Sequence, residues 1–247
     1  MVLPSIPELV IREVALGVTT FSKPFTGLGF LHLGGRSVAV KLSSGDVWIL
    51  ASTPLSQETK EALDKMGPLK WIMAGNAFHH MYIGEFKKAY PEAKLIGMKG
   101  LVEKKQKEGI TLDGAFGVDP PETKYGFEDE IYPCYFSGRS NGEVAFLHAP
   151  TKSLIVSDLI FNLPCTEQYS KTKITGRIPI IGDSLAPGTW LHGVFARRGV
   201  TNIETMSRDA KTVLEWQPER IIPAHGDVIE KDAPAKWAEV YRQFLSP

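Results

Sequence analysis

Three segments of the chain place metal-ligand residue types where an apolar, strand-like run ends. His79 and His80 end the segment NAFHH that comes after LKWIMA, Asp158 lies at the end of the strand SLIVSDLIF, and His225 lies at the tip of the strand RII. Polar residues at the carboxyl ends of strands commonly form the sites of α/β proteins, and imidazole and carboxylate groups bind zinc and related divalent ions. The sequence therefore predicts one mononuclear metal site of these four residues, with Asn76 lining it and zinc as the expected ion.

The two adjacent histidines set a condition on this site. Successive side chains of a helix point about 100° apart, so His79 and His80 reach one ion together only if one lies on the loop or in a first, irregular turn. A helix is predicted from about His79 to Tyr90. Because a catalytic zinc keeps three protein ligands and an open position for water, one of the four candidates can instead cap, pack or support the site through hydrogen bonds.

The remaining histidines give weaker signals. His148 closes the strand EVAFLH beside the turn to SLIVSD and is a candidate for lining the site. His32 and His192 are expected on the surface or in the packing of the protein.

The segment GRSNG at 138–142 matches the G-x-S-x-G pattern of serine hydrolases. Ser140, Asp158 and His225 also follow one another in the chain order of a serine triad. A nucleophile elbow needs a strand, a sharp turn and a helix, whereas the residues after this segment, EVAFLH, are typical of a second strand. The segment is therefore interpreted as a glycine-rich hairpin turn.

The elements that position these residues follow from turn and capping signals. The runs SVAVKL and VWILA flank turn-forming residues at 43–46 and predict a hairpin. Ser56 can cap a helix that a Gly-Pro pair ends, and Thr201 and Glu204 form a capping box for a later helix. Asp232 is predicted to cap the last helix.

The chain is expected to form a single domain of two halves. The stretch 111–130 is rich in Gly, Pro, Asp and Glu and predicts a loop between halves of about 1–120 and 121–247. Each half has strands first and helices after, and these strands are too short and numerous for a doubly wound sheet. A two-sheet sandwich with helices outside fits this order better. The irregular stretch from about 164 to 187 predicts a lid.

Composition and charge limit the partners of the protein. The 28 Lys and Arg residues balance the 28 Asp and Glu residues, so no global field attracts nucleic acid or an anionic membrane. The chain has no run of about 18 apolar residues and no basic start before an apolar core, which predicts a cytoplasmic protein. Cys134 and Cys165 are expected as buried free thiols. A small-molecule substrate is the expected partner, and the oligomeric state stays open.

The order of these features resembles the metallo-β-lactamase fold superfamily over nearly the whole chain: a hairpin, a strand with a histidine cluster, a strand with Asp158 and a strand ending in PAHGD. More narrowly, GGRSVAV, FHHMYIGEFKKAYPEAKLIG and HAPTKSLIVSDLIFN resemble the DUF4336 family. The resemblance implies an α/β (α+β) fold that forms a four-layer αββα sandwich. It also implies one or two metal ions, usually zinc, that activate water at one edge of the sheets.

The superfamily's H-x-H-x-D-H motif falls on the segment GNAFHH. Gly75 and Ala77 stand in place of its first two histidines, so those ligands are missing. His79 then occupies the place of the motif's Asp, and His80 occupies the place of its last histidine.

The motif's next histidine is also missing, because Arg139 occupies its place. The usual bridging carboxylate and the last histidine survive as Asp158 and His225, which leaves the reduced site. The guanidinium of Arg139 is expected to neutralise Asp158 or to clamp a substrate carboxylate, with an ordinary salt bridge as the alternative. Ala51 and Ser52 stand where the superfamily has an Asp, which further indicates a remodelled pocket.

The resemblance implies a metal-dependent hydrolase in which metal-bound water, with its pKa lowered toward ~7, attacks a small ester, lactone, amide or thioester. Asp158 and Arg139 are the expected catalytic side chains. The alternative is a catalytically degenerate member that binds a metal or a small molecule without turnover. Retention of His225 and Asp158 favours an occupied metal site, whereas Gly75, Ala77 and Arg139 favour loss of hydrolysis.

Overall fold

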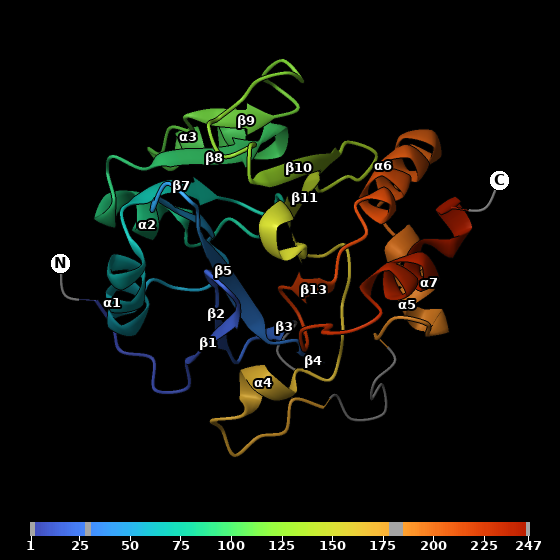
Figure 1. Cartoon of the computed structure of the whole chain (residues 1–247), viewed down its shortest axis with the longest axis horizontal. Helices are drawn as coiled ribbons and strands as arrows, with labels where there is room; N and C mark the ends of the chain where they lie inside the picture. Colours follow the sequence, from blue (N-terminus) through green and yellow to red (C-terminus); the bar gives the residue numbers. More distant parts are fainter. Residues whose placement is uncertain (1–2, 28–30, 178–184, 246–247) are drawn as a thin grey trace.

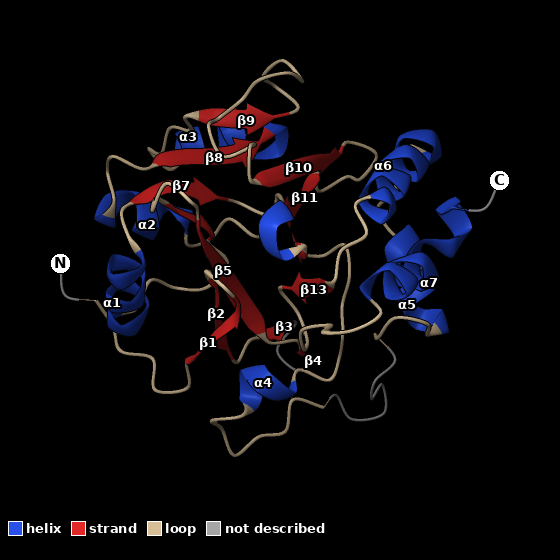
Figure 2. Ribbon diagram, viewed as in Figure 1, coloured by secondary structure: helices blue, strands red, loops and turns tan. Residues whose placement is uncertain are grey.

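Two β-sheets lie face to face between two layers of helices in the computed structural model, which describes residues 3–27, 31–177 and 185–245 (Figure 1). Helices α1, α2 and α3 lie outside one sheet, and helices α5, α6 and α7 lie outside the other (Figure 2). The αββα sandwich predicted from the sequence is therefore confirmed.

The larger sheet has the strand order β1-β2-β5-β6-β7-β8-β9. Its strands are β1 (Val10–Ala15), β2 (Val18–Lys23), β5 (Gly35–Lys41), β6 (Val47–Leu50), β7 (Leu69–Met73), β8 (Lys94–Met98) and β9 (Gly114–Phe116). The first four strands pair antiparallel, and the pairs from β6 to β9 are parallel. Parallel pairs need crossover connections, which run through α1 (Gln57–Met66), α2 (Ile83–Ala89), and η1 (Lys99–Leu101) with α3 (Val102–Lys107).

The smaller sheet has the strand order β10-β11-β12-β13, with only the last pair parallel. Its strands are β10 (Ile131–Phe136), β11 (Glu143–His148), β12 (Ser153–Val156) and β13 (Arg220–Pro223). The remaining elements are the ribbon β3 (Thr26–Gly27) and β4 (Leu31–His32), η2 (Ala149–Thr151), α4 (Thr166–Tyr169), α5 (Trp190–Arg197), α6 (Ile203–Glu215) and α7 (Ala233–Leu245).

Strand β11 shows how the sandwich buries both faces of this sheet. Val144 and Phe146 pack in the core between the sheets, and Ala145 and Leu147 pack in the core beneath the C-terminal helices. Successive side chains of a strand point to opposite faces, so a strand that is buried throughout contributes to two cores. Burial of a side chain such as Phe146 stabilises the fold by about 1.5–3 kcal/mol.

The predicted hairpin and one of the predicted helix caps are confirmed, and another cap is wrong. The hairpin of β5 and β6 and the helix capped by Ser56 are confirmed. The capping box at Thr201 is wrong, because the side chain of Asn202 accepts the hydrogen bond from the Thr205 N–H that caps α6. The hydroxyl of Thr201 instead donates to the carbonyl of Gly138.

The stretches that were predicted to be irregular also contain regular structure. Strand β9 lies within the expected loop 111–130, and α4 lies within the expected lid at 164–187. Residues 178–184 of that lid lie outside the described residues. No helix within the described ranges is long and apolar enough to span a membrane.

Candidate metal centre

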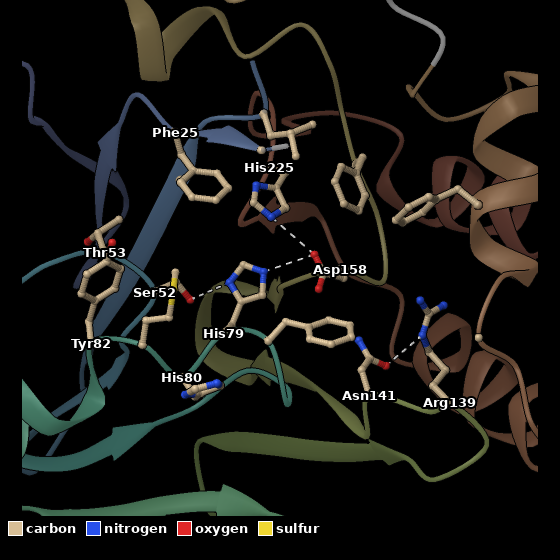
Figure 3. Close-up of a pocket in the computed structure, with 18 of the residues that line it drawn as sticks. Phe25, Ser52, Thr53, His79, His80, Tyr82, Arg139, Asn141, Asp158 and His225 are labelled. Atoms are coloured by element: carbon tan, nitrogen blue, oxygen red, sulfur yellow. Dashed lines mark hydrogen bonds and ion pairs between the residues drawn. The ribbon is translucent and has the colours of Figure 1, made fainter. Parts of the chain in front are cut away.

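Three of the four predicted ligands meet where strands of the two sheets end (Figure 3). His79 lies in the loop after β7, Asp158 follows β12 by two residues, and His225 follows β13 by two residues. One ligand atom from each of the three side chains lies within 4.8 Å of the others. The structure thus brings together one residue from each of the three segments at which an apolar run ends.

Both imidazoles present the same atom to the same carboxylate oxygen. The Nε2 atom of His79 lies 3.2 Å from Oδ1 of Asp158, and the Nε2 atom of His225 lies 3.4 Å from it. The side chains of His79, Asp158 and His225 are 12%, 12% and 7% exposed. The cluster is therefore shielded from bulk water while one side stays open to a cavity.

The other nitrogen of each ring has a partner outside the cluster. The Nδ1 atom of His79 lies 3.2 Å from Oγ of Ser52, and the Nδ1 atom of His225 lies 2.7 Å from the carbonyl oxygen of Gly34. A carbonyl only accepts, so Nδ1 of His225 carries the hydrogen, and Nε2 is the ring atom that faces the carboxylate. The Nε2 atoms of both rings thus face Oδ1 of Asp158, an arrangement that could hold a metal ion.

Burial and charge have opposite effects on the pKa values of Asp158 and His79. Burial raises the pKa of Asp158, but His79 and His225 outweigh it and hold the pKa of this carboxyl well below its ordinary value. Burial lowers the pKa of His79, and Asp158 outweighs that effect, so the pKa of the ring is raised. A carboxylate that stays ionised next to two imidazole nitrogens, each with its second nitrogen held by a fixed partner, is a donor set that fits a divalent metal.

Asn76 forms the turn that brings His79 to the cluster. Its Oδ1 accepts hydrogen bonds from the N–H groups of Phe78 and His79 at 2.7 and 3.0 Å, and its Nδ2 donates to Oδ2 of Asp158 at 2.8 Å. The helix predicted from His79 begins only at Ile83, because this side-chain turn replaces helical hydrogen bonds. Asn76 is fully buried and supports Asp158 from behind the cavity.

His80 does not join the three converging ligand residues (Figure 3). It lines the same cavity, but its ring points away from Asp158 (Figure 3). Its Nδ1 is buried without a hydrogen-bond partner in the described parts of the chain. Burial lowers the pKa of His80, and Lys105 and Lys104 lower it further. Three of the four predicted ligand residues therefore converge, and His80 does not, because adjacent side chains of this turn point in different directions.

Arg139 lines the cavity but forms no ion pair with Asp158 within the described residues. Its Nε donates to Oδ1 of Asn141 at 3.4 Å, and its Nη1 donates to the carbonyl of Ala196 at 3.2 Å. The predicted neutralisation of Asp158 by direct contact is thus wrong. The guanidinium instead binds the carboxyl end of α5 while it faces the cavity.

Two other sequence candidates lie outside the cluster. His148 lies at the end of β11, and Glu143 lies at its start. Nδ1 of His148 contacts Oγ1 of Thr151 at 2.7 Å. His148 is not among the described residues that line the cavity. The segment around Ser140 is the turn between the antiparallel strands β10 and β11, as interpreted from the sequence. No hydrogen bond joins Ser140 to His225 among the described contacts, and the serine triad is not assembled.

Glu143 organises the cluster, although the residue patterns do not single it out. Its Oε1 accepts from the N–H groups of Ser157, Asp158 and Leu159 at 2.8, 2.7 and 3.0 Å, and its Oε2 accepts from Nδ2 of Asn76 at 3.0 Å. Burial, with the charge of Asp158, raises the pKa of Glu143 to about 7. The signal in the sequence is an acidic residue at the start of the otherwise apolar strand EVAFLH, since a buried carboxylate needs partners.

Two buried side chains hold the turn that carries His225. Nη1 of Arg36 donates to two backbone carbonyls of the turn at 2.5 and 2.7 Å. Gln168 accepts from the N–H of Gly226 at 3.1 Å and donates to a carbonyl on the other side of His225 at 2.9 Å. Gly226 has a φ of +92°, and a Cβ there would lie 2.1 Å from the carbonyl oxygen of Asn162. Only glycine fits this approach.

The cluster forms part of the wall of a cavity of about 600 Å³, a volume in the range of small-molecule sites. Phe161 stacks on His225 with ring centroids 5.0 Å apart and an interplanar angle of 21°. The apolar side chains that line the cavity include Phe25, Phe78, Met81, Tyr82, Phe161 and Phe195. The site thus combines a charged cluster with an extensive aromatic wall.

Solved structures with a similar fold are metallo-β-lactamases. The metallo-β-lactamase DIM-1, exposed to ceftazidime, has a TM-score of 0.63 and 14% identity, covering 97% of this chain and 99% of its own. The metallo-β-lactamase from Pontibacter korlensis has a TM-score of 0.61 and 11% identity, covering 95% and 99%. FIM-1 from Pseudomonas aeruginosa, in its mono-zinc form, has a TM-score of 0.62 and 9% identity, covering 96% and 97%.

No family model and no curated protein sequence matches the chain. The likeness to the solved structures extends over nearly the whole length of each chain, and at these identities it establishes the fold. The chain therefore has the metallo-β-lactamase fold, with a candidate metal-binding triad of His79, Asp158 and His225 at the ends of its strands.

Proposed function

We propose that the protein is a metal-dependent hydrolase that acts on a small ester, lactone, amide or thioester, with one divalent cation held by His79, Asp158 and His225. The observation that carries this proposal is the convergence of two Nε2 atoms on one carboxylate oxygen at the wall of the cavity. Three protein ligands leave an open position for water, which is the arrangement of catalytic zinc sites. Zinc is the proposed ion, and iron, manganese and nickel accept the same ligands.

A bound divalent cation would lower the pKa of a coordinated water toward ~7 and polarise the carbonyl of the substrate. The chain's own residues would fix the geometry of that reaction. Ser52 and Gly34 hold the imidazoles in the required orientation, and Asn76 holds the second oxygen of Asp158. Ligands whose second atoms are fixed in this way stay in position when the substrate binds.

The alternative function is a catalytically degenerate protein that binds a metal or a small molecule without turnover. The surroundings of Gly75 support this alternative, because a Cβ there would lie 1.9 Å from Oγ of Ser157. A side chain at Gly75, where the resemblance places a motif histidine, would therefore require Ser157 to move. We also propose that the chain forms a single domain and that, within the superfamily, it is most similar to the DUF4336 family.

The test is turnover of a panel of chromogenic esters, lactones and thioesters before and after removal of metal by a chelator. Asp158→Asn is compared with Asp129→Asn, a matched control whose carboxylate is 97% exposed. We expect the chelator and Asp158→Asn to lower the rate by about 100-fold or more, while Asp129→Asn keeps it. Equal rates with and without the chelator would contradict metal-dependent hydrolysis and favour the alternative.

A further inference from the structure

We propose that the substrate of this site carries an anionic group, a carboxylate or a phosphate, on an apolar body, and that Arg139 and Arg198 bind the anionic group. This inference rests on the proposed function, because it names the substrate class of the same cavity.

Arg139 is a buried cation that forms no salt bridge within the described residues. It is 7% exposed, and among the described residues its guanidinium donates hydrogen bonds to the neutral oxygens of Asn141 and Ala196. The charge of Glu143 acts on it, but the hydrogen bonds of that carboxylate go to backbone N–H groups and to the amides of Asn76 and Asn141. A buried guanidinium is normally paired with an anion, and the face that Arg139 turns to the cavity is where such a partner can bind.

Backbone pairing brings the segment that contains Arg198 next to the segment that contains Arg139. Arg139 forms a bridge with Val200, and the N–H of Ser140 donates to the carbonyl of Gly199 at 2.8 Å. Both arginines line the cavity. No side chain in the described part of the chain forms a hydrogen bond or an ion pair with the guanidinium of Arg198. The guanidinium groups of two arginines that line one cavity match the oxygens of a carboxylate or a phosphate through charge-assisted hydrogen bonds.

Taken together, the charged side chains that line the cavity favour a bound anion. Lys23, Arg139 and Arg198 line it, whereas Asp158 is the one acidic residue among the described lining residues. Asp158 is already committed to His79 and His225. Lys23 forms no salt bridge among the described residues, and its Nζ donates to the carbonyl of Pro24, although the charge of Glu8 acts on it. A bound divalent cation would add to this positive charge.

The rest of the lining favours an apolar body for the same ligand. Phe78 and Met81 line the cavity and are 67% and 56% exposed. Phe195 lies in α5, three residues before Arg198, which caps the end of this helix. Its ring packs on Phe161 with ring centroids 4.7 Å apart. Apolar side chains exposed at a binding site lose water contact when an apolar ligand covers them. The anionic end of the ligand would thus lie at the arginines, and its apolar part against these rings.

The experiment measures binding to protein that has been stripped of metal, with the chelator then dialysed away, so that no bound cation contributes to anion binding. The probes are phenylacetate, phenyl phosphate and the neutral benzyl alcohol, and the readout is the Kd from titration calorimetry or ligand-observed NMR. The variants are Arg139→Gln, Arg198→Gln and the matched control Arg197→Gln. Arg197 is an exposed arginine that neighbours Arg198 and does not line the cavity.

We expect at least one anion to bind about tenfold or more tightly than benzyl alcohol, and Arg198→Gln to remove most of this preference while Arg197→Gln keeps it. A preference for phenylacetate assigns a carboxylate substrate, and a preference for phenyl phosphate assigns a phosphate substrate. Arg139→Gln is expected to weaken binding too, but it also removes the contact with α5. The exposed Arg198 therefore keeps the test valid if the Arg139 variant does not fold.

Equal binding of all three probes, no detectable binding of any of them, or an unchanged anion preference in Arg198→Gln would overturn the inference. This result is distinguishable from failure of the proposed function. Anion binding without turnover by the metal-loaded enzyme leaves the anion site standing and contradicts the hydrolase. Chelator-sensitive turnover of neutral esters without an anion preference supports the hydrolase and contradicts the anion site.

Discussion

The Nδ1 atom of His225 and the carbonyl oxygen of Gly34 lie 2.7 Å apart, although the two residues are separated by 191 positions in the chain. Gly34 has a φ of +66°, and a Cβ there would lie 2.1 Å from Oε1 of Gln168. Gln168 in turn accepts the hydrogen bond from the N–H of Gly226. The orientation of one candidate metal ligand therefore depends on a glycine that precedes β5 in the other sheet.

Replacing this glycine tests that dependence. Gly34→Ala forces either Gln168 or the Gly34 carbonyl to move, and we expect metal affinity to fall by about 10- to 100-fold, as for other partners that orient ligands. The measurement is competition for zinc against a chelating dye. Gly45→Ala is the matched control, because Gly45 also has a positive φ, +88°, but an added Cβ there meets nothing within 4 Å. Equal losses of zinc affinity in both variants would show that backbone strain alone explains the effect.

Glu143→Gln tests the support of Asp158. The substituted amide can accept the three backbone N–H groups only by turning its NH₂ toward Nδ2 of Asn76, where two donors then face each other. We expect the free energy of unfolding to fall by about 1–3 kcal/mol and metal affinity to fall with it.

Glu130→Gln serves as the control for this variant. Glu130 accepts from the N–H of Ser43, also through backbone hydrogen bonding, but it does so at an exposed site. Urea unfolding and zinc competition are measured on both variants. If Glu143→Gln matches the wild type in both measurements, Glu143 does not organise the cluster.

The pH dependence of stability is expected to report on His192. Burial lowers the pKa of His192 from 6.5 to about 4, and its Nε2 accepts the N–H of Phe161 at 2.8 Å. The unfolded chain therefore binds a proton more readily than the folded chain. The stabilisation is complete above the unfolded pKa of 6.5 and is lost as the pH falls toward 4, by up to about 3 kcal/mol.

The measurement compares the wild type with His192→Gln, whose amide oxygen can accept the same hydrogen bond without titrating. Urea unfolding is followed from pH about 7 to about 4.5. We expect the wild type to lose stability relative to the variant over this window. Parallel curves would mean that His192 does not titrate differently in the folded and unfolded states.

The strand-end pattern was sufficient to place His79, Asp158 and His225, because each follows an apolar run that is long enough to identify a strand. Whether His80 also reached the site could not be derived from the sequence. The outcome depended on the turn that Asn76 forms, which delays the helix to Ile83. The αββα order could be predicted because turn and capping signals separated most of its strands and helices.

The supporting residues could not be predicted in the same way. Gly34, Gln168 and Arg36 reach the turn of His225 from distant parts of the chain, and local patterns carry no information on such contacts. Glu143 lies at the first position of a buried strand, where its acidity only indicates that some partner exists. Arg139 was placed at the site by the resemblance, but its bond to the carboxyl end of α5 depends on tertiary packing.

The most direct test of the three-residue metal site is the metal content of the untagged protein, measured by elemental analysis after reconstitution with zinc and removal of free ions. The variants are His79→Ala, Asp158→Ala, His225→Ala and His80→Ala. We expect about one ion per chain in the wild type and in His80→Ala, and strong loss of the ion in the other three. Absence of metal from the reconstituted wild type, or a loss in His80→Ala as large as in His225→Ala, would contradict the three-residue site.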